Sequence, residues 1–545
     1  MQLKKILPIF AVAACSLANA QEVAVVNGTP FEMNKRGESI QRVLNTDRND
    51  FSFLTLSGRK TFRVVSLDEK LKMDVSKELE LPSIGKKEVK YVDAGQIGEI
   101  TYFFSQYFDR KADQVTLYAS DLDIKKGKFN EHYEAMVVKD KDFGMFSRPF
   151  QVVRSLDSTK IMFICTYPAK NKENARIAVK VTDNSLNELW KNDIIFDQEN
   201  RDFSVLDYLI DSKGNLHMSV SNRLENKEKK AKGSKGRYYV SIYSYYPEEE
   251  KLKEYEVGFK DEIILTAHLE LNVTNEIICT GFYAEGKFFD AGMKGFYFLR
   301  IDPTTHQVKS SNISPFDKKF LGKLMNERRA EKGKGITGYV VRNTYARADG
   351  GMTVVAEYYL YQEVKDQDGN VVKQIWTYGN VLVFFLDAEG KMKTYSILKK
   401  NQICSTKGTI GSLMALAGAT ATPGAHELPY YGIGTMMKDD KLYLIYNENP
   451  KNELRLKEDK KPKSVRENSS ETVLVIFEDD GSIESNVLFK SKDKKSGYKM
   501  PVMPRYAFKY SENGLLVIGK KGKQARIVDI QLGDDKKTSK KKKKK

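Results

Sequence analysis

One pattern recurs along this chain of 545 residues: an extended run of β-branched and aromatic residues follows a tight turn signal. Most of these runs are followed by a second strand with a polar hairpin turn, as in 296–313, 381–398 and 473–489. Asp or Asn beside Gly in such turns supplies the positive φ that hairpins need. The pattern recurs at intervals of roughly 50 to 90 residues, and its runs begin near Phe51, Glu99, Lys160, Asn215, Asn275, Gly351, Lys441 and Gly514.

Four strands per repeat at this spacing predict an all-β fold, a β-propeller with eight blades. Seven blades is the nearest alternative, and two β-sandwich domains is a further one. The 29 Tyr and 28 Phe against two Trp are consistent with strands packed face to face. The last repeat stops one strand short, so we expect residues 22–26 to supply its missing outer strand. Such a clasp would close the ring and leave no open sheet edge.

The first 20 residues have the pattern of a signal peptide. Lys4 and Lys5 precede a short apolar segment, 6–17, and Ala18-Asn19-Ala20 fits the small-x-small cleavage rule. We therefore expect an exported protein, in the periplasm or at the outer membrane, with a propeller domain over 21–533.

An alternative concerns membrane attachment. Residues 12–15 (VAAC) resemble a lipobox, which would leave Cys15 as a lipid anchor. No later stretch approaches the roughly 20 apolar residues of a transmembrane helix. The Lys-rich end, 534–545, is predicted to be a disordered tail.

The long insertions all fall in equivalent places of the predicted blades. In a blade with strands a to d, the b–c and d–a connections emerge on one face, and the a–b and c–d turns emerge on the other. A single loop-rich face on a rigid scaffold is typical of binding proteins. The insertions that predict this face are 225–237, 284–295, 318–334, 362–378, 399–429 and 447–471.

The formal net charge of +17 is concentrated in these insertions and in the tail. Insertion 225–237 has six basic and two acidic residues, 318–334 has seven and two, and 451–471 has seven and five. A basic face favours an anionic glycan, lipopolysaccharide or an envelope protein as partner, and a nucleic-acid partner is not expected. The alternative is that the charges only keep solvated loops soluble.

Candidate binding residues follow from this face. Trp376 is the better of the two tryptophans as an exposed aromatic platform, and 320–330 is expected to form one short amphipathic helix on the rim. The predicted basic contacts are Lys229, Lys230, Arg237, Arg328, Arg329 and Lys332, and the aromatic contacts are Trp376, Tyr430 and Tyr431.

Motifs of catalysis are missing from the sequence. The five histidines are isolated, and no HExxH, GxSxG, P-loop or strand-linked GxGxxG occurs. Residues 366–369 (DQDG) begin like a calcium loop but lack its later ligands, so a hairpin turn is expected. Cys165 and Cys279 are expected to be small buried hydrophobes. We therefore predict no catalytic residue, metal or cofactor.

Two segments, 378–402 (YGNVLVFFLDAEGKMKTYSILKKNQ) and 439–452 (DDKLYLIYNENPKN), resemble uncharacterised exported β-propeller-like proteins of Gram-negative bacterial envelopes. The resemblance implies a propeller and an envelope location, and it brings no catalytic residues. The sequence thus predicts an exported binding or scaffolding propeller that recognises an anionic envelope component or a protein partner. The alternative is a polysaccharide-active enzyme whose carboxylates gather at the propeller channel.

Overall fold

The computed structural model describes residues 23–33, 38–57, 61–84, 87–144, 148–168, 173–223, 238–258, 262–285, 292–407, 428–466, 469–490 and 500–533. Within them, eight antiparallel sheets of four or five strands follow one another along the chain. The predicted signal peptide, Cys15 and the Lys-rich tail lie outside the described residues.

The first four sheets each contain four strands in sequence order. Blade 1 contains β3 (Ser39–Asn45), β4 (Ser52–Ser57), β5 (Thr61–Leu67) and β6 (Met73–Leu79). Blade 2 contains β9 (Lys90–Ile97), β10 (Ile100–Asp109), β11 (Gln114–Asp123) and β12 (Lys128–Lys139). Blade 3 contains β13 (Phe150–Arg154), β14 (Lys160–Thr166), β15 (Asn174–Asp183) and β16 (Glu188–Glu199). Blade 4 contains β17 (Phe203–Ile210), β18 (Leu216–Arg223), β19 (Tyr238–Tyr246) and β20 (Lys251–Val257).

The later sheets are more elaborate. Blade 5 has a divided first strand, β21 (Glu262–Ile264) and β22 (His268–Leu271), then β23 (Ile277–Glu285), β24 (Gly295–Asp302) and β25 (Gln307–Pro315). Blade 6 contains β26 (Tyr339–Ala346), β27 (Met352–Lys365), β28 (Val371–Leu386) and β29 (Met392–Leu398), and β30 (Gln402–Lys407) pairs with β28. Blade 7 contains β31 (Gly434–Lys438), β32 (Lys441–Glu448), β33 (Glu471–Phe477) and β34 (Ile483–Lys490). Blade 8 contains β35 (Val502–Ser511), β36 (Gly514–Lys521), β37 (Gln524–Leu532), β1 (Val23–Asn27) and β2 (Phe31–Glu32).

Small elements connect or decorate the blades. Strands β7 (Ser83–Ile84) and β8 (Lys87–Glu88) form a two-stranded ribbon. The helical segments are η1 (Asn200–Asp202), η2 (Pro247–Glu249), α2 (Lys318–Leu324), α3 (Glu327–Glu331) and α4 (Asn452–Lys457).

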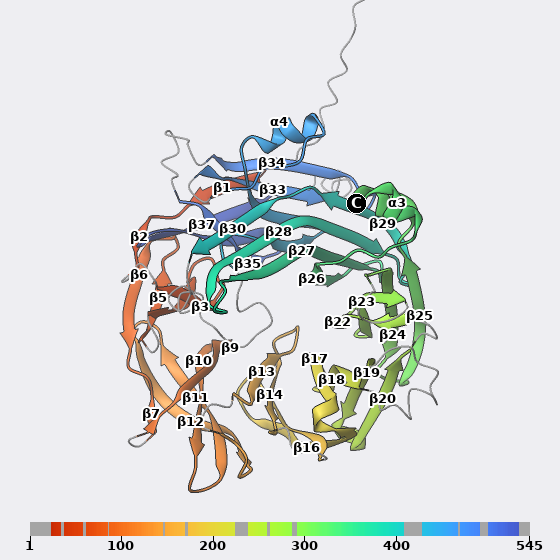
Figure 1. The fold of residues 1–545 in the computed structure, drawn as a ribbon. Helices are drawn as coiled ribbons and strands as arrows, with labels where there is room; N and C mark the ends of the chain where they lie inside the picture. The colour runs from red at the N-terminus through yellow and green to blue at the C-terminus, as the bar shows by residue number, and fades with distance from the viewer. Residues whose placement is uncertain are drawn as a thin grey trace, which may run out of the picture.

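The sheets form a ring around a common centre (Figure 1). The first strands of successive blades contact one another, β3 with β9, β9 with β13, β13 with β17, β17 with β22, and β22 with β26. The first strand of each blade is therefore the innermost one and lines the channel. The molecule is an eight-bladed β-propeller, as predicted.

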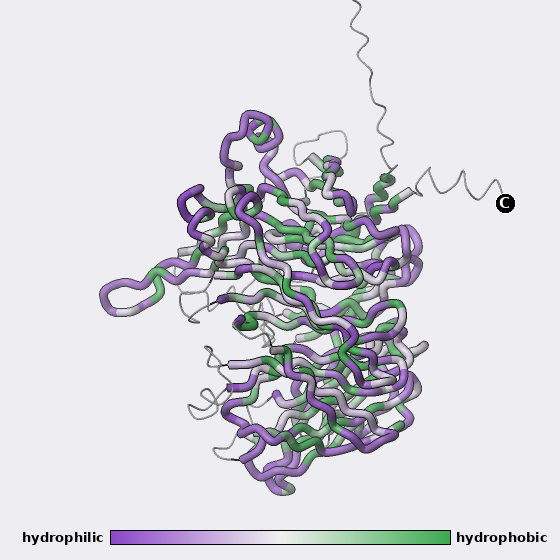
Figure 2. Tube along the Cα trace, turned by 90° about the vertical axis from the view of Figure 1, so that its right-hand side faces the viewer, coloured by the Kyte–Doolittle hydropathy of each residue, from purple (hydrophilic) through white to green (hydrophobic). Residues whose placement is uncertain are grey.

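The hydrophobic core lies between neighbouring blades. Phe104 of blade 2 and Phe163 of blade 3, both fully buried, have ring centroids 5.6 Å apart. Similarly, Phe296 of blade 5 meets Phe384 of blade 6 edge-on at 4.4 Å. Figure 2 shows the hydrophobic stretches inside the sheets and the hydrophilic ones at their margins. Adjacent blades thus share their cores, and Cys165 and Cys279 are buried in them as expected.

The ring closes through a strand contributed by each end of the chain. Strand β1 pairs antiparallel with β37, with Val23 opposite Leu532 and Asn27 opposite Val528. Nearby, Arg48 of blade 1 is bound to the buried Asp529 of blade 8 at 2.7 Å. The predicted clasp is confirmed, and β37 is covered rather than left as a sheet edge.

Candidate anion-binding site on the loop face

A pocket of about 570 Å³ lies where several predicted insertions meet. We call the side from which the b–c and d–a connections emerge the loop face, and this cavity the rim pocket. Its wall is formed by segments 324–339, 377–380, 399–401 and 459–462, together with Tyr358. Strands within each blade alternate in direction, so the connections that contain 324–339, 399–401 and 459–462 emerge on one side of the ring, where residues 377–380 of β28 also lie. The sequence predicts that the long insertions share one face, and in the rim pocket parts of three of them lie together.

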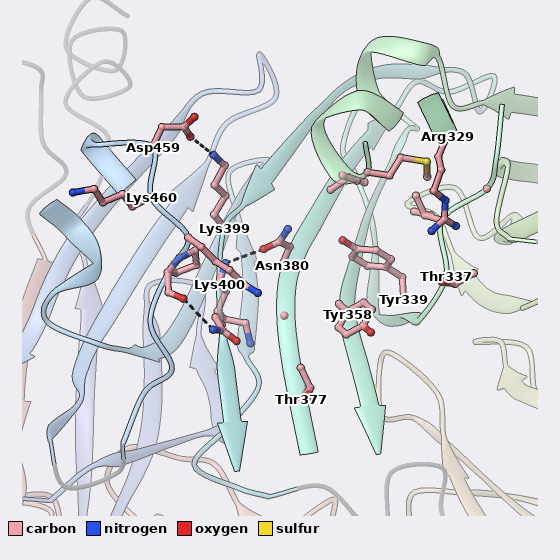
Figure 3. A pocket seen from close by; sticks show the side chains of 18 residues that line it. Arg329, Thr337, Tyr339, Tyr358, Thr377, Asn380, Lys399, Lys400, Asp459 and Lys460 are labelled. Atoms are coloured by element: carbon pink, nitrogen blue, oxygen red, sulfur yellow. Dashed lines mark hydrogen bonds and ion pairs between the residues drawn. The ribbon is translucent and has the colours of Figure 1, made fainter. Parts of the chain in front are cut away.

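One wall of the rim pocket joins the connection after β29 to the insertion of blade 7. Lys399 forms an ion pair with Asp459 at 2.8 Å, and the Asn401 side-chain amide donates to the Pro462 carbonyl at 3.0 Å. The Lys400 backbone N–H donates to the Asn380 side chain at 3.1 Å. In Figure 3, Lys399, Asp459 and Lys460 form this side of the pocket.

The opposite wall comes from the two short helices between blades 5 and 6. Arg329 and Thr337 lie on this side, and Tyr339, Tyr358 and Asn380 lie between the two walls (Figure 3). The Asn326 side chain caps α3 by accepting from the Arg329 backbone N–H at 3.0 Å. This cap fixes the turn that carries Arg329.

The rim pocket is basic. Its lining includes one carboxylate, Asp459, and five basic residues: Arg329, Lys399, Lys400, Lys460 and Lys461. The hydrogen bond and charge of Lys399 lower the pKa of Asp459, so this carboxylate is ionised and already paired. Within the described part of the chain, Arg329 and Lys461 form no ion pair. Lys400 and Lys460 are ion-paired as well, with Glu357 and Glu458. The excess of positive charge in the pocket therefore comes from Arg329 and Lys461, beside two tyrosine rings and several polar side chains.

The structure brings only some of the predicted binding residues to this pocket. Arg329 lines it, and Arg328 and Lys332 are exposed on the same short segment. Lys229, Lys230 and Arg237 lie outside the described residues.

The prediction that the aromatic contacts are exposed is wrong. Trp376 is 1% exposed and Tyr431 is 5% exposed, and the hydroxyl of the half-buried Tyr430 donates to the Lys520 carbonyl. The physical reason is that β30 adds a third strand beside β28 and that segment 463–465 packs over it. Trp376 lies against Tyr361 and Val465 in the resulting cluster, so it is core rather than a platform.

Two predicted insertions have more regular structure than expected. Segment 362–378 is mostly hairpin, because β27 continues to Lys365 and β28 begins at Val371. Its turn contains Gly369 at φ 84°, and the Gly369 N–H donates to the Asp366 carbonyl, which confirms a hairpin turn at 366–369. The single helix expected over 320–330 is two helices, α2 and α3, because Met325 is extended and Asn326 begins a new one.

Sequence reasoning missed the other lining residues of the rim pocket. Tyr339, Tyr358 and Asn380 lie on strands whose hydrophobic pattern identifies only their blade. Lys399 and Lys461 lie in insertions that the sequence did single out, but nothing local distinguishes them from other surface lysines.

The channel holds a second set of polar groups, from the inner strands of blades 4, 5 and 6. Asp207 of β17 accepts from the Leu269 backbone N–H at 3.0 Å, and Glu270 of β22 accepts from the Thr344 hydroxyl of β26 at 3.2 Å. Burial raises the pKa values of Asp207 and Glu270, the latter to about 7, and lowers the pKa of His268. A carboxyl group that titrates near neutrality is suited to acid–base chemistry.

No metal site or membrane span is seen among the described residues. No three His, Cys, Asp or Glu side chains of this part of the chain are grouped to hold a metal ion. None of the helices in the described ranges has the length and apolar character needed to cross a bilayer.

Comparison with known proteins gives similarity of fold only. No protein-family model and no curated protein matches the sequence. Among solved structures, the chain is similar to the Dos1 propeller, with 9% identity over 93% of this chain and 96% of that one and a TM-score of 0.41. It is also similar to the polysaccharide lyase Uly1 (10% identity, 83% and 94% covered, TM-score 0.35). The WD40 domain of SCAP from fission yeast gives 8% identity, 94% and 95% covered, and a TM-score of 0.35.

Proposed function

We propose that this protein is an exported binding or scaffolding propeller of the bacterial envelope, and that its loop face recognises an anionic component such as lipopolysaccharide or an acidic glycan. The observation that carries the proposal is the rim pocket, where Arg329 and Lys461, which form no ion pair with a described residue, line a cavity beside Tyr339 and Tyr358. Basic side chains attract anions over about 10 Å at moderate ionic strength. The signal-peptide pattern of residues 1–20 and the resemblance of 378–402 and 439–452 to envelope propellers support the proposed location.

The pocket suits a sugar-sized anionic group more than an extended apolar ligand. Tyrosine rings offer flat surfaces for a sugar ring, and the polar groups of Thr337 and Asn380 can bond hydroxyl groups. Arg329 and Lys461 supply charge without an ion-pair partner among the described residues. An anionic substituent would therefore replace water around these two cations.

The experiment is a pull-down of the protein on immobilised lipopolysaccharide, with neutral dextran as the blank, from about 50 to about 500 mM NaCl. We expect binding at low salt that falls as salt rises. The double variant Arg329→Gln/Lys461→Gln should lose about tenfold or more in affinity, since each surface cation contributes about 1 kcal/mol to an anionic surface.

The matched control is Lys213→Gln/Lys391→Gln, which removes the same charge from the β17–β18 and β28–β29 turns of the opposite face. This control should bind like the wild type. Equal losses of affinity in both double variants would mean that net charge alone explains the binding, and would contradict specific binding in the rim pocket. Release of shortened glycan during incubation would instead favour the alternative, a polysaccharide-active enzyme that uses Asp207 and Glu270.

A further inference from the structure

The available positive charge of the rim pocket lies on two opposite walls. Neither Arg329 nor Lys461 forms an ion pair with a described residue. Arg329 lies on the wall formed by the short helices, and Lys461 belongs to segment 459–462 of the other wall (Figure 3). Tyr339 and Tyr358 lie between the walls, with ring centroids 5.7 Å apart. The gap between the two walls therefore contains two whole aromatic rings, and it is wider than a single carboxylate, sulfate or phosphate group.

Local hydrogen bonds hold the backbone of each cationic residue in place. Asn326 caps the helix that contains Arg329, and the Lys334 backbone N–H donates to the Arg329 carbonyl at 3.0 Å. On the other wall, the Arg455 guanidinium donates to the Lys461 carbonyl from Nε at 2.9 Å and from Nη2 at 2.8 Å. Both walls are therefore organised before a ligand binds, which lowers the ordering cost of binding.

A β-bulge forms the floor between the walls. On β28, Gly379 and Asn380 together lie opposite the single residue Tyr358 of β27, because the register of this strand pair shifts here. A Cβ at Gly379 would be 3.0 Å from the Tyr358 ring, and a Cβ at Gly338 would be 2.6 Å from it. Bulges are common beside functional sites. The ring of Tyr358 thus lies directly against two glycines, which fix it as a flat surface in the pocket.

The hydroxyl of Tyr339 supplies a hydrogen-bond donor at this floor. The Asn380 side-chain oxygen accepts from the Lys400 backbone N–H at 3.1 Å, so its amide N–H groups are left to donate. Burial raises the pKa of Tyr339 to about 12, although a hydrogen bond from Asn380 opposes this shift. The phenol therefore keeps its proton at neutral pH, and its O–H can donate to a ligand oxygen.

We propose that the rim pocket binds an acidic disaccharide unit with an anionic group at each end, one on Arg329 and the other on Lys461, and with a sugar ring over Tyr358. This inference rests on the proposed function and specifies the ligand of the same pocket. The cavity of about 570 Å³ lies within the range of roughly 300 to 1,000 Å³ of small-molecule sites. Two linked sugars can hold their anionic groups farther apart than one sugar does, which matches cations on opposite walls.

The test is isothermal titration calorimetry of the full chain at constant low ionic strength with two matched pairs of probes. The first pair is an unsaturated chondroitin disaccharide with its carboxylate alone, and the same disaccharide with a sulfate on the second sugar. The second pair is the glucosamine disaccharide of lipopolysaccharide without acyl chains, in its monophosphorylated and bisphosphorylated forms. N,N′-Diacetylchitobiose is the neutral disaccharide.

We expect the two-anion member of at least one pair to bind about fivefold more tightly than its one-anion match, and the neutral disaccharide to give no measurable heat. The pair with the tighter member identifies the source of the anionic groups. Tighter binding of the bisphosphate indicates lipopolysaccharide, and tighter binding of the sulfated disaccharide indicates an acidic glycan.

Single variants assign the two anionic groups. For the tighter two-anion probe, Arg329→Gln and Lys461→Gln should each weaken binding about fivefold, and the double variant about 25-fold, because contacts on separate walls add. For the one-anion probe of that pair, only one of the two variants should weaken binding. The matched control, Lys319→Gln/Lys463→Gln, removes the same charge from exposed positions of the same two insertions outside the pocket, and should bind like the wild type.

A further pair of variants tests the floor of the pocket. Tyr358→Leu removes the flat ring, and Tyr358→Phe keeps it. We expect Tyr358→Leu to weaken binding of the two-anion probe by about fivefold more than Tyr358→Phe does. Circular dichroism establishes that each variant is folded, and Tyr339→Phe, which removes only the hydroxyl donor, tests the floor if Tyr358→Leu does not fold.

The proposal is overturned if neither two-anion probe binds more tightly than its one-anion match. It is also overturned if folded Arg329→Gln or folded Lys461→Gln binds the two-anion probes as well as the wild type does. In both cases the proposed function stands, provided that the double variant still loses binding to lipopolysaccharide. Absence of salt-dependent binding to lipopolysaccharide by the wild type would instead refute the proposed function itself.

Discussion

At the scale of single residues, buried ionisable groups set the pH response of the channel. Glu270 of β22 lies near Asp207 of the adjoining inner strand β17, and burial is the main reason that its pKa is raised from 4.5 to about 7. The neutral carboxyl is favoured in the folded protein. The contribution of Glu270 to the free energy of unfolding is therefore fully present below about pH 4.5, and it is lost as the pH rises through about 7.

We expect Glu270→Gln to remove this loss. Between pH 4.5 and 8, the wild type should lose up to about 3 kcal/mol more in free energy of unfolding than the variant does, because one pKa unit corresponds to about 1.4 kcal/mol. Urea unfolding at pH 5 and pH 8 measures the difference. Glu99→Gln, at an exposed position, is the control, and identical pH slopes for wild type and Glu270→Gln would contradict the assignment.

At the scale of elements, short caps determine which side chains reach the rim pocket. Helix α3 has only five residues, so its stability in isolation is small and the capping bond from Asn326 matters. The preceding helix, α2, is anchored by the buried Phe320 and Leu321. The turn with Arg329 is thus held by this local hydrogen bond together with the buried Ala330.

We expect Asn326→Ala to reduce binding to lipopolysaccharide without unfolding the propeller. Loss of an N-cap costs about 1 kcal/mol, which should loosen the turn with Arg329 and lower affinity by a few fold. Asn326→Ser retains a side-chain acceptor without adding charge and should bind like the wild type. The salt-dependent pull-down measures the affinity of each variant. Binding by Asn326→Ala equal to that of the wild type would mean that the cap-fixed position of Arg329 is not needed for binding.

At the scale of the whole molecule, the blades depend on one another. Residues of blades 7 and 8 form one hydrophobic cluster, in which Tyr443 and Ile445 pack with Val517 and Val528. Blade 8 in turn holds the N-terminal strand β1. No blade of this pair buries its apolar face alone, so the ring is expected to fold as a unit.

A chain that ends at residue 499 should therefore lose more than one blade. It lacks β35–β37, which leaves β1 without its partner and exposes the face of blade 7. We expect low soluble yield or a loosely packed product that binds a hydrophobic dye, whereas a chain that ends at residue 533 keeps every described strand and should behave as the full protein. Size-exclusion chromatography and thermal unfolding distinguish them, and a compact truncated chain with an unchanged melting temperature would contradict this account.

The sequence by itself determined the repeat of strands, the turns and the closure of the ring. These features depend on local patterns: alternation along a strand, and glycines such as Gly390 and Gly481, whose φ angles of 81° and 88° fit their turns. The strand order also placed the insertions on one face, since direction alternates within a blade. Counting charges in the insertions also predicts a basic face, of which insertion 225–237 lies outside the described residues.

Only the tertiary structure decided which side chains of that face are accessible. Trp376 is buried because β30 and segment 463–465, distant in sequence, fold against β28. Arg342 and Lys400 both bind Glu357, because a bulge in β26 and the connection after β29 bring them to the same buried carboxylate. Burial and charge excess are sums over neighbours that come from remote parts of the chain, and no local pattern specifies those neighbours.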